Sequence, residues 1–255
     1  MLPDLATRTW GVGHPSVVLL HGWIGSTVDW ELVAEPLADD RAVISYDHRG
    51  HGRSPHTGDY TFAALLADLA GWMDVHGLTQ VDLVGHSMGG VVAMQYALLH
   101  PERVRSLVLV DTSAAPAGLL PMEVIEGLAE LGRSAGMAAV RDAIAPMADA
   151  ALDYQPPRPR DPDRGGIGLL TMDPDAFVDL ARELGSYPSM VSALATVRCP
   201  TTVIVGEHDT GLLDGCREIA AAVPGARLVV MASCGHSPQE DDPDTFVAVV
   251  REHLG

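Results

Sequence analysis

The stretch Val81-Asp82-Leu83-Val84-Gly85-His86-Ser87-Met88-Gly89-Gly90, followed by the apolar segment 91–99, decides the fold of this chain. A buried strand that ends in a glycine-flanked serine and leads into a helix is the context of a nucleophile elbow. Gly85 and Gly89 suit the sharp turn because a Cβ at either position would collide with neighbouring chain. The turn presents Ser87 Oγ at a helix N-terminus, where amide dipoles favour developing negative charge. Ser87 is the candidate nucleophile, and a serine that merely caps the helix is the alternative.

Around this stretch, short runs of Val, Ile and Leu alternate with longer segments of helical period. Thr61 is expected to cap a helix over 61–76, and Asp242 with Pro243 to begin the last helix. The alternation predicts an α/β fold with a doubly wound, mostly parallel sheet covered on both faces. The expected strands are 17–20, 42–46, 81–85, 106–110, 201–205 and 227–231.

The alternation stops between the strand at 106–110 and the strand at 201–205. Helices are expected at 119–131, 137–147 and 175–184, and the segment 154–166, with four prolines, is expected to be a loop. We therefore predict a core domain of residues 1–112 and 197–255 and a helical cap of residues 113–196. Because the insertion leaves from the carboxyl ends of strands, where ligands bind in open α/β sheets, it should cover Ser87.

These features resemble the α/β-hydrolase fold family over nearly the whole chain. His21-Gly22-Trp23-Ile24-Gly25 is similar to the family's oxyanion loop. The resemblance implies that the backbone N–H groups of Trp23 and Met88 stabilise the negatively charged oxygen of a tetrahedral intermediate. The Trp23 side chain is expected to form a wall of the substrate pocket.

The family resemblance also implies a base and an acid downstream of the nucleophile, in the order Ser, Asp or Glu, His. Asp209 follows the strand at 201–205, and His236 follows the strand at 227–231. His236 is expected to accept the Ser87 proton while Asp209 orients the imidazole. Asp111 and Glu207 remain alternative acids.

The segment from Asp47 to Ser54 resembles the family's Asp-x-Arg-Gly-x-Gly-x-Ser segment, whose role is structural. His48 and His51 lie in it, but no clear further ligand accompanies them, so no metal site is expected. Cys234 lies close to His236, yet a serine elbow leaves no need for a cysteine nucleophile. No cofactor is expected.

The N-terminal residues depart from the family pattern, because members commonly open with a strand hairpin. The 16 residues before Val17 have room for about one strand. We expect the first edge strand of the sheet to be short or absent.

The composition restricts the possible partners. The formal net charge is −18, and all 16 basic residues are Arg. Such a chain repels nucleic acid and anionic membranes, so neither is an expected partner. Three separated cysteines and an N-terminus without an apolar run favour a reducing, cytoplasmic location. We expect a small-molecule substrate, with the protein acting as a monomer or a homodimer.

The expected activity is hydrolysis of a carboxylic ester of a small, partly hydrophobic substrate through an acyl-enzyme on Ser87. The same residues could serve a lactonase, a carbon-carbon bond hydrolase, a small amide hydrolase or a cofactor-free perhydrolase. A serine at the elbow argues against haloalkane dehalogenases and epoxide hydrolases, which use Asp there. A non-catalytic ligand receptor on the same scaffold is the alternative from another class. The expected substrate-binding residues are Trp23, His86, Met122, Met137, Met147 and Tyr187.

Overall fold

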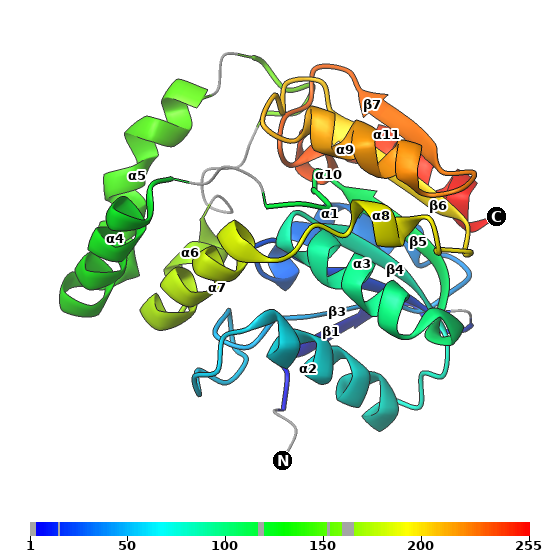
Figure 1. The fold of residues 1–255 in the computed structure, drawn as a ribbon, viewed down its shortest axis with the longest axis horizontal. Helices are drawn as coiled ribbons and strands as arrows, with labels where there is room; N and C mark the ends of the chain where they lie inside the picture. The colour runs from blue at the N-terminus through cyan, green and yellow to red at the C-terminus, as the bar shows by residue number, and fades with distance from the viewer. Residues whose placement is uncertain (1–3, 15, 117–119, 152–153, 160–165) are drawn as a thin grey trace.

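The fold is a seven-stranded sheet between two layers of helices, seen in a computed structural model that describes residues 4–14, 16–116, 120–151, 154–159 and 166–255 (Figure 1). For residues 147–151 only the helical backbone is described. The strand order is β1-β3-β2-β4-β5-β6-β7, and only β1 runs antiparallel to its neighbour. The predicted doubly wound, mostly parallel sheet is confirmed. The strands are β1 (Thr7–Trp10), β2 (Val17–Leu20), β3 (Val43–Tyr46), β4 (Val81–His86), β5 (Val104–Val110), β6 (Thr201–Gly206) and β7 (Arg227–Met231).

All six predicted strands are present, with ends that shift by two residues at most. One strand, β1, precedes them at the edge of the sheet, and it has only four residues. The expectation of a short first edge strand is therefore confirmed.

Strand residues alternate between two hydrophobic cores, one on each face of the sheet. In β2, Val18 and Leu20 belong to one core while Val17 and Leu19 belong to the other, because successive side chains point to opposite faces. The helices α2 (Phe62–Val75), α3 (Met88–Leu99), α8 (Val191–Leu194) and α9 (Leu213–Ala222) cover the first face. The helices α1 (Glu31–Leu37), α10 (Pro238–Asp241) and α11 (Pro243–Leu254), with the 3-10 turn Thr27–Trp30, cover the second. A further 3-10 turn, Pro101–Arg103, leads into β5.

The predicted helix starts are confirmed where a capping residue marks them. Thr61 Oγ1 accepts the N–H of Ala64 at 3.2 Å and caps α2. Asp242 accepts the N–H of Thr245 at 3.2 Å, with Pro243 in the first turn of α11. These ends are readable from sequence because a cap is a contact between residues only three positions apart.

Between β5 and β6 the chain forms α4 (Met122–Ala135), α5 (Met137–Ala151), α6 (Ile167–Leu170) and α7 (Pro174–Ser186), before α8. In Figure 1, α4 and α5 stand at the left, away from the sheet. The three predicted helices correspond to α4, α5 and α7, although Leu119 lies outside the described residues. The four-residue helices α6 and α8 are too short to show a helical period. Of the predicted loop, residues 154–159 are not helical and 160–165 lie outside the description.

The strand order reverses between β2 and β4, because β3 lies on one side of β2 and β4 on the other. The loops that follow β2 and β4 therefore leave the sheet side by side, in the crevice where doubly wound sheets bind ligands. Leu20 pairs with Gly85 at this edge, and His86 pairs with Val110. Among the described residues, no helix is both long and apolar enough to span a membrane.

Candidate active site

Ser87 occupies a strained turn between β4 and α3. Its backbone has φ 53° and ψ −118°, a positive φ that side chains other than Gly rarely adopt. A Cβ at Gly85 would collide with the Gly89 carbonyl, and a Cβ at Gly89 would collide with the Leu20 carbonyl. The turn is held on the sheet because the Ser87 N–H donates to Val110 O at 2.9 Å. Gly89 therefore lets the turn approach the end of β2, and Gly85 lets the start of α3 approach β4.

The loop after β2 lies directly against this turn. A Cβ at Gly22 would lie 3.2 Å from Ser87 Cβ and 3.1 Å from His86 Nδ1. Among the hydrogen bonds of the described residues, neither the Trp23 N–H nor the Met88 N–H has an acceptor. Both candidate oxyanion donors therefore belong to segments that meet at Ser87.

Two buried histidines fix the loop after β2. His21 Nε2 accepts the His48 N–H at 2.9 Å, so its proton is on Nδ1, which lies 2.8 Å from Gly22 O. Burial, with a further contribution from His51, lowers the pKa of His21 to about 3 and keeps the ring neutral. His51 Nε2 donates to the Trp23 carbonyl. The segment after β3 therefore supports the loop through hydrogen bonds, a structural role like the one that the family resemblance implied.

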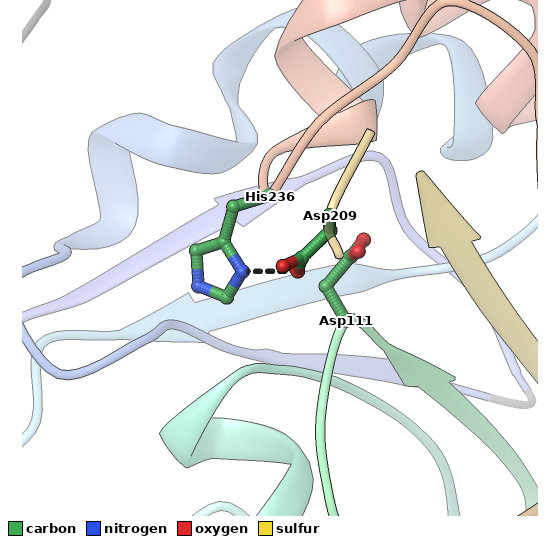
Figure 2. A group of neighbouring side chains, drawn as sticks. All are labelled: Asp111, Asp209 and His236. Atoms are coloured by element: carbon green, nitrogen blue, oxygen red, sulfur yellow. Dashed lines mark hydrogen bonds and ion pairs between the residues drawn. The ribbon is translucent and has the colours of Figure 1, made fainter. Parts of the chain in front are cut away.

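His236 and Asp209 face each other across the loops that follow β7 and β6 (Figure 2). His236 Nδ1 lies 2.7 Å from Asp209 Oδ2. Burial acts to raise the pKa of Asp209, but the hydrogen bond and charge of His236 and a hydrogen bond with Asp111 outweigh it, so the pKa lies below its usual value. The Asp209 side chain is 11% exposed, whereas that of His236 is 47% exposed. Asp209 is therefore the buried member of the pair, and the His236 ring is the member that solvent can reach.

His86 connects the elbow to the His236 loop. Its Nε2 donates to the His236 carbonyl at 2.6 Å, and the two rings lie 4.9 Å apart. Burial, followed by the effect of His236, lowers the pKa of His86 to about 3, so it stays neutral. Because His86 directly precedes Ser87, this contact ties the loop of His236 to the elbow. No hydrogen bond joins Ser87 Oγ to His236 within the described residues.

The alternative acids lie elsewhere in the network. Glu207 Oε2 accepts the Ser233 N–H at 3.0 Å, and its side chain is 55% exposed. Asp111 is fully buried, and its Oδ1 accepts the Gly206 N–H at 3.0 Å. Neither carboxyl is hydrogen-bonded to His236 among the described residues, whereas Asp209 is.

Asp111, Asp209 and His236 form the one group that the described residues offer for a metal ion, with one ligand atom of each within 4.8 Å of the others. The hydrogen bond between Asp209 and His236 already uses His236 Nδ1. A cation bound there would displace the proton that orients the imidazole. The donor set therefore fits the acid-base pair better than a resident metal.

The predicted substrate-binding residues are spread over the insertion and the loop after β2. The Trp23 ring stacks on Phe177 at 4.6 Å, and its Nε1 donates to Phe177 O at 3.0 Å. Met122 in α4 is partly buried, Met137 in α5 is 6% exposed, and the side chain of Met147 lies outside the described residues. The contact between Trp23 and α7 therefore puts the insertion next to the candidate oxyanion loop.

Tyr187 follows the last residue of α7 and contacts the first residues of the insertion. Its hydroxyl donates to Ser113 O at 2.9 Å, and its ring lines a groove of about 420 Å³ with Phe62 and Leu98. Along α3, this groove begins roughly 10 Å beyond Ser87, at 1.5 Å per helical residue. Ser113 directly follows Thr112, whose hydroxyl donates to Ser87 O at 2.8 Å. A substrate contact for Tyr187 therefore stays a prediction.

Sequence reasoning missed one further contact between the insertion and the site. The Tyr154 ring stacks on His208 at 4.7 Å, and its hydroxyl donates to Asp241 Oδ2 at 2.9 Å. The same oxygen accepts the Gly235 N–H at 2.9 Å, next to His236. The only sequence signal was a tyrosine at the start of a proline-rich segment. This pattern does not predict which residues the tyrosine contacts.

Comparison with known proteins identifies relatives over most of the chain. The family model described as alpha/beta hydrolase fold matches residues 15–135. The chain is 30% identical over 253 residues to a putative 2-succinyl-6-hydroxy-2,4-cyclohexadiene-1-carboxylate synthase of Bacillus subtilis, covering 94% of this chain and 90% of the relative.

Solved structures show the same fold. The enol-lactonase from Burkholderia xenovorans LB400 superposes with a TM-score of 0.83 at 27% identity, covering 99% of this chain and 96% of that one. A thermophilic esterase from Thermogutta terrifontis also has a TM-score of 0.83, at 29% identity, covering 99% of this chain and 93% of that one.

Proposed function

This chain belongs to the α/β-hydrolase fold family, and we propose that it hydrolyses carboxylic esters of small, partly hydrophobic molecules through an acyl-enzyme on Ser87. The observation that supports the proposal most is the 2.7 Å contact between His236 Nδ1 and Asp209 Oδ2, on loops tied to the strained Ser87 turn through His86. Similarity to an esterase and a lactonase supports a hydrolase.

In the first half of the proposed reaction, Ser87 Oγ attacks the ester carbonyl while His236 Nε2 takes the hydroxyl proton. Asp209 holds the His236 tautomer and stabilises the imidazolium that forms. The Trp23 and Met88 N–H groups stabilise the oxyanion, each by about 3 kcal/mol. The intermediate then expels the alcohol, which takes the proton from His236, and the acyl group remains on Ser87.

In the second half, water replaces the alcohol. His236 removes a proton from the water, the hydroxide attacks the acyl carbonyl, and Ser87 leaves with the proton returned by His236. The Trp23 and Met88 donors serve both tetrahedral intermediates, because each places the charge on the same oxygen. The cycle uses only side chains and backbone of this chain and needs no cofactor.

A lactone is the second candidate substrate, because the chain superposes on an enol-lactonase over 99% of its length. A lactone is a cyclic ester, so the same steps open its ring and leave the alcohol on the acid product. The residues around Trp23 and the insertion, with Met122, Met137 and Met147 as the proposed lining, would choose between cyclic and open esters.

We place the enzyme in the cytoplasm and divide it into the core 1–112 and 197–255 and the cap 113–196.

The proposal is tested with a fluorophosphonate probe and a panel of p-nitrophenyl esters and lactones. Wild type is expected to be labelled and to turn over at least one ester, whereas Ser87→Ala is expected to lose labelling and about 1,000-fold or more in kcat. Ser134→Ala, a change at an exposed serine of α4, is the matched control and should react like wild type.

Equal labelling of Ser87→Ala and wild type would refute the serine mechanism. An unlabelled wild type without turnover, whose melting temperature nevertheless rises with a small molecule, would favour the ligand receptor instead. Turnover of an amide or a carbon-carbon substrate with no ester turnover would keep Ser87 and change the substrate class.

A further inference from the structure

Asp111 is a buried carboxyl that the proposed reaction does not use. It follows β5, is fully buried and has φ 41°, a conformation that Asn and Gly tolerate better than other residues. Its backbone N–H donates to Ile204 O at 2.9 Å, and its Oδ1 accepts the Gly206 N–H at 3.0 Å. The backbone of β6 therefore holds both the main chain and the side chain of Asp111.

The second oxygen of Asp111 lacks a donor. Oδ2 is buried and, as a carboxylate oxygen, has no hydrogen-bond partner among the described residues. Buried polar atoms are nearly always paired, so an ionised carboxylate would be a costly exception. A proton on Oδ2 changes the atom from an unpaired acceptor into a donor.

The acceptor for that proton is Asp209. Figure 2 shows the two carboxyl groups side by side, with His236 on the far side of Asp209. The ionisable groups that face Asp111 are Asp209, Asp241 in α10, the Cys216 thiol in α9 and His236. Of these groups only His236 is a base, and the Gly206 N–H is the hydrogen-bond contact of Asp111 that favours its ionised form.

Burial raises the pKa of Asp111 well above its usual value, and the charge of Asp209 and the hydrogen bond with it raise this pKa further. The same hydrogen bond contributes to the low pKa of Asp209. The two carboxyls therefore divide one proton unequally, as neighbouring carboxyls do when both cannot ionise.

We propose that Asp111 is a neutral positioning residue that donates a hydrogen bond from Oδ2 to the Asp209 carboxylate and so holds it against His236. The role rests on the proposed function of Ser87, Asp209 and His236. The proton stays on Asp111 throughout the cycle. The hydrogen bond from Asp111 partly offsets the negative charge of Asp209. It thereby limits how strongly that charge stabilises the His236 imidazolium.

Two substitutions separate this role from its alternatives, with the rate of fluorophosphonate labelling against pH as the readout. Asp111→Asn keeps a neutral donor and the backbone conformation, so its rate and profile should stay within about threefold of wild type. Asp111→Gly accepts the positive φ but has no donor. Its rate should fall about tenfold or more, and its acidic limb should move to higher pH as the full Asp209 charge acts on His236.

The matched control is Asp82→Asn. Asp82 is also buried, but it accepts hydrogen bonds from Arg105 and Ser106. It is the second residue of β4, at the opposite end of this strand from Ser87. This change should lower stability and leave the labelling profile unchanged. A fall in the Asp111→Asn rate as large as that of Asp209→Asn, or a shift of its acidic limb to lower pH, would overturn the proposal, because either result requires an ionised Asp111. An unchanged Asp111→Gly would also overturn it.

A second measurement decides the protonation state without any activity. If Asp111 is neutral when folded and ionised when unfolded, wild type takes up a proton on folding above about pH 4. As the pH rises, the folding equilibrium constant of wild type should then fall by up to tenfold per pH unit relative to that of Asp111→Asn. This fall should continue until the pH reaches the raised pKa of Asp111 in the folded protein. Parallel urea-unfolding stabilities of the two proteins from pH 5 to 8 would refute a neutral Asp111. Because unfolding needs no probe or substrate, this result stands even if wild type is not labelled.

Discussion

At the scale of single residues, the Ser87 turn depends on neighbours that take no part in the proposed chemistry. Its φ of 53° is unfavourable for a side chain and persists because β4, α3 and the adjacent strands fix both ends of the turn. The Thr112 hydroxyl donates to Ser87 O at 2.8 Å, and the Ser87 N–H donates to Val110 O at 2.9 Å. The conformation of the elbow is therefore set by the packing around it and not by the serine side chain.

Gly89→Ala tests that dependence. The added Cβ would collide with the Leu20 and His21 carbonyls, so we expect a loss of about 3 kcal/mol in the free energy of unfolding and much slower fluorophosphonate labelling. The control is Gly127→Ala in α4, where no atom lies within 4 Å of the added Cβ. Measured by urea unfolding, this control should be neutral or more stable by about 0.5–1 kcal/mol. Wild-type stability and labelling in Gly89→Ala would contradict the packing argument.

At the scale of elements, the candidate site is a meeting of strand ends with the insertion. The loops after β2, β4, β5, β6 and β7 supply the oxyanion loop, Ser87, Asp111, Asp209 and His236 in turn. The insertion touches these loops where a Cβ at Gly168 would collide with the Ile24 carbonyl, where Phe177 stacks on Trp23, and where Tyr154 reaches Asp241. The insertion thus reaches the site through α6, α7 and Tyr154, whereas α4 and α5 stand away from the sheet (Figure 1).

Tyr154→Phe tests the contact with the His236 loop. The ring can still stack on His208, but the hydrogen bond to Asp241 is lost, so we expect a cost of about 1 kcal/mol and a melting temperature lower by about 3 °C. Because Asp241 also accepts the Gly235 N–H, the labelling rate of Ser87 should fall as well.

The matched control is Tyr60→Phe, which removes a hydrogen bond of 2.5 Å to Asp173 at the start of α7. It should lower the melting temperature to a similar extent and leave the labelling rate unchanged. If both variants slow labelling equally, the effect belongs to the insertion as a whole and not to the His236 loop.

At the scale of the whole molecule, charge is the dominant feature. Against 34 acidic residues the chain has 16 basic ones, a formal net charge of −18. Arginines form surface ion pairs such as Arg182 with Glu126 and Arg217 with Asp214, but these leave most acidic groups to repel one another. Such self-repulsion destabilises the compact state and is screened by salt.

Raising sodium chloride from 10 to 500 mM at pH 7 should therefore raise the melting temperature by about 2–4 °C, the shift that about 1 kcal/mol produces in a domain of this size. Potassium chloride should give the same rise, because screening does not depend on which monovalent cation is present. A melting temperature that falls with salt would mean that the surface ion pairs outweigh the net repulsion.

The sequence by itself determined the features that depend on residues close together in the chain. The elbow at Ser87, the caps at Thr61 and Asp242, and the six strands are local patterns in which each residue's neighbours set its conformation. The short edge strand followed from counting the residues before Val17. Family resemblance added the chain order of the candidate catalytic residues.

Only the tertiary structure decided how groups far apart in the chain meet. Asp209, Asp111 and Glu207 are all carboxyls close after strands, and only the packing of the loops put Asp209 Oδ2 at 2.7 Å from His236 Nδ1. The same packing buried Asp111 beside Asp209. The physical reason is that burial and side-chain distance are set by every element that packs around a residue, and no local sequence pattern contains them.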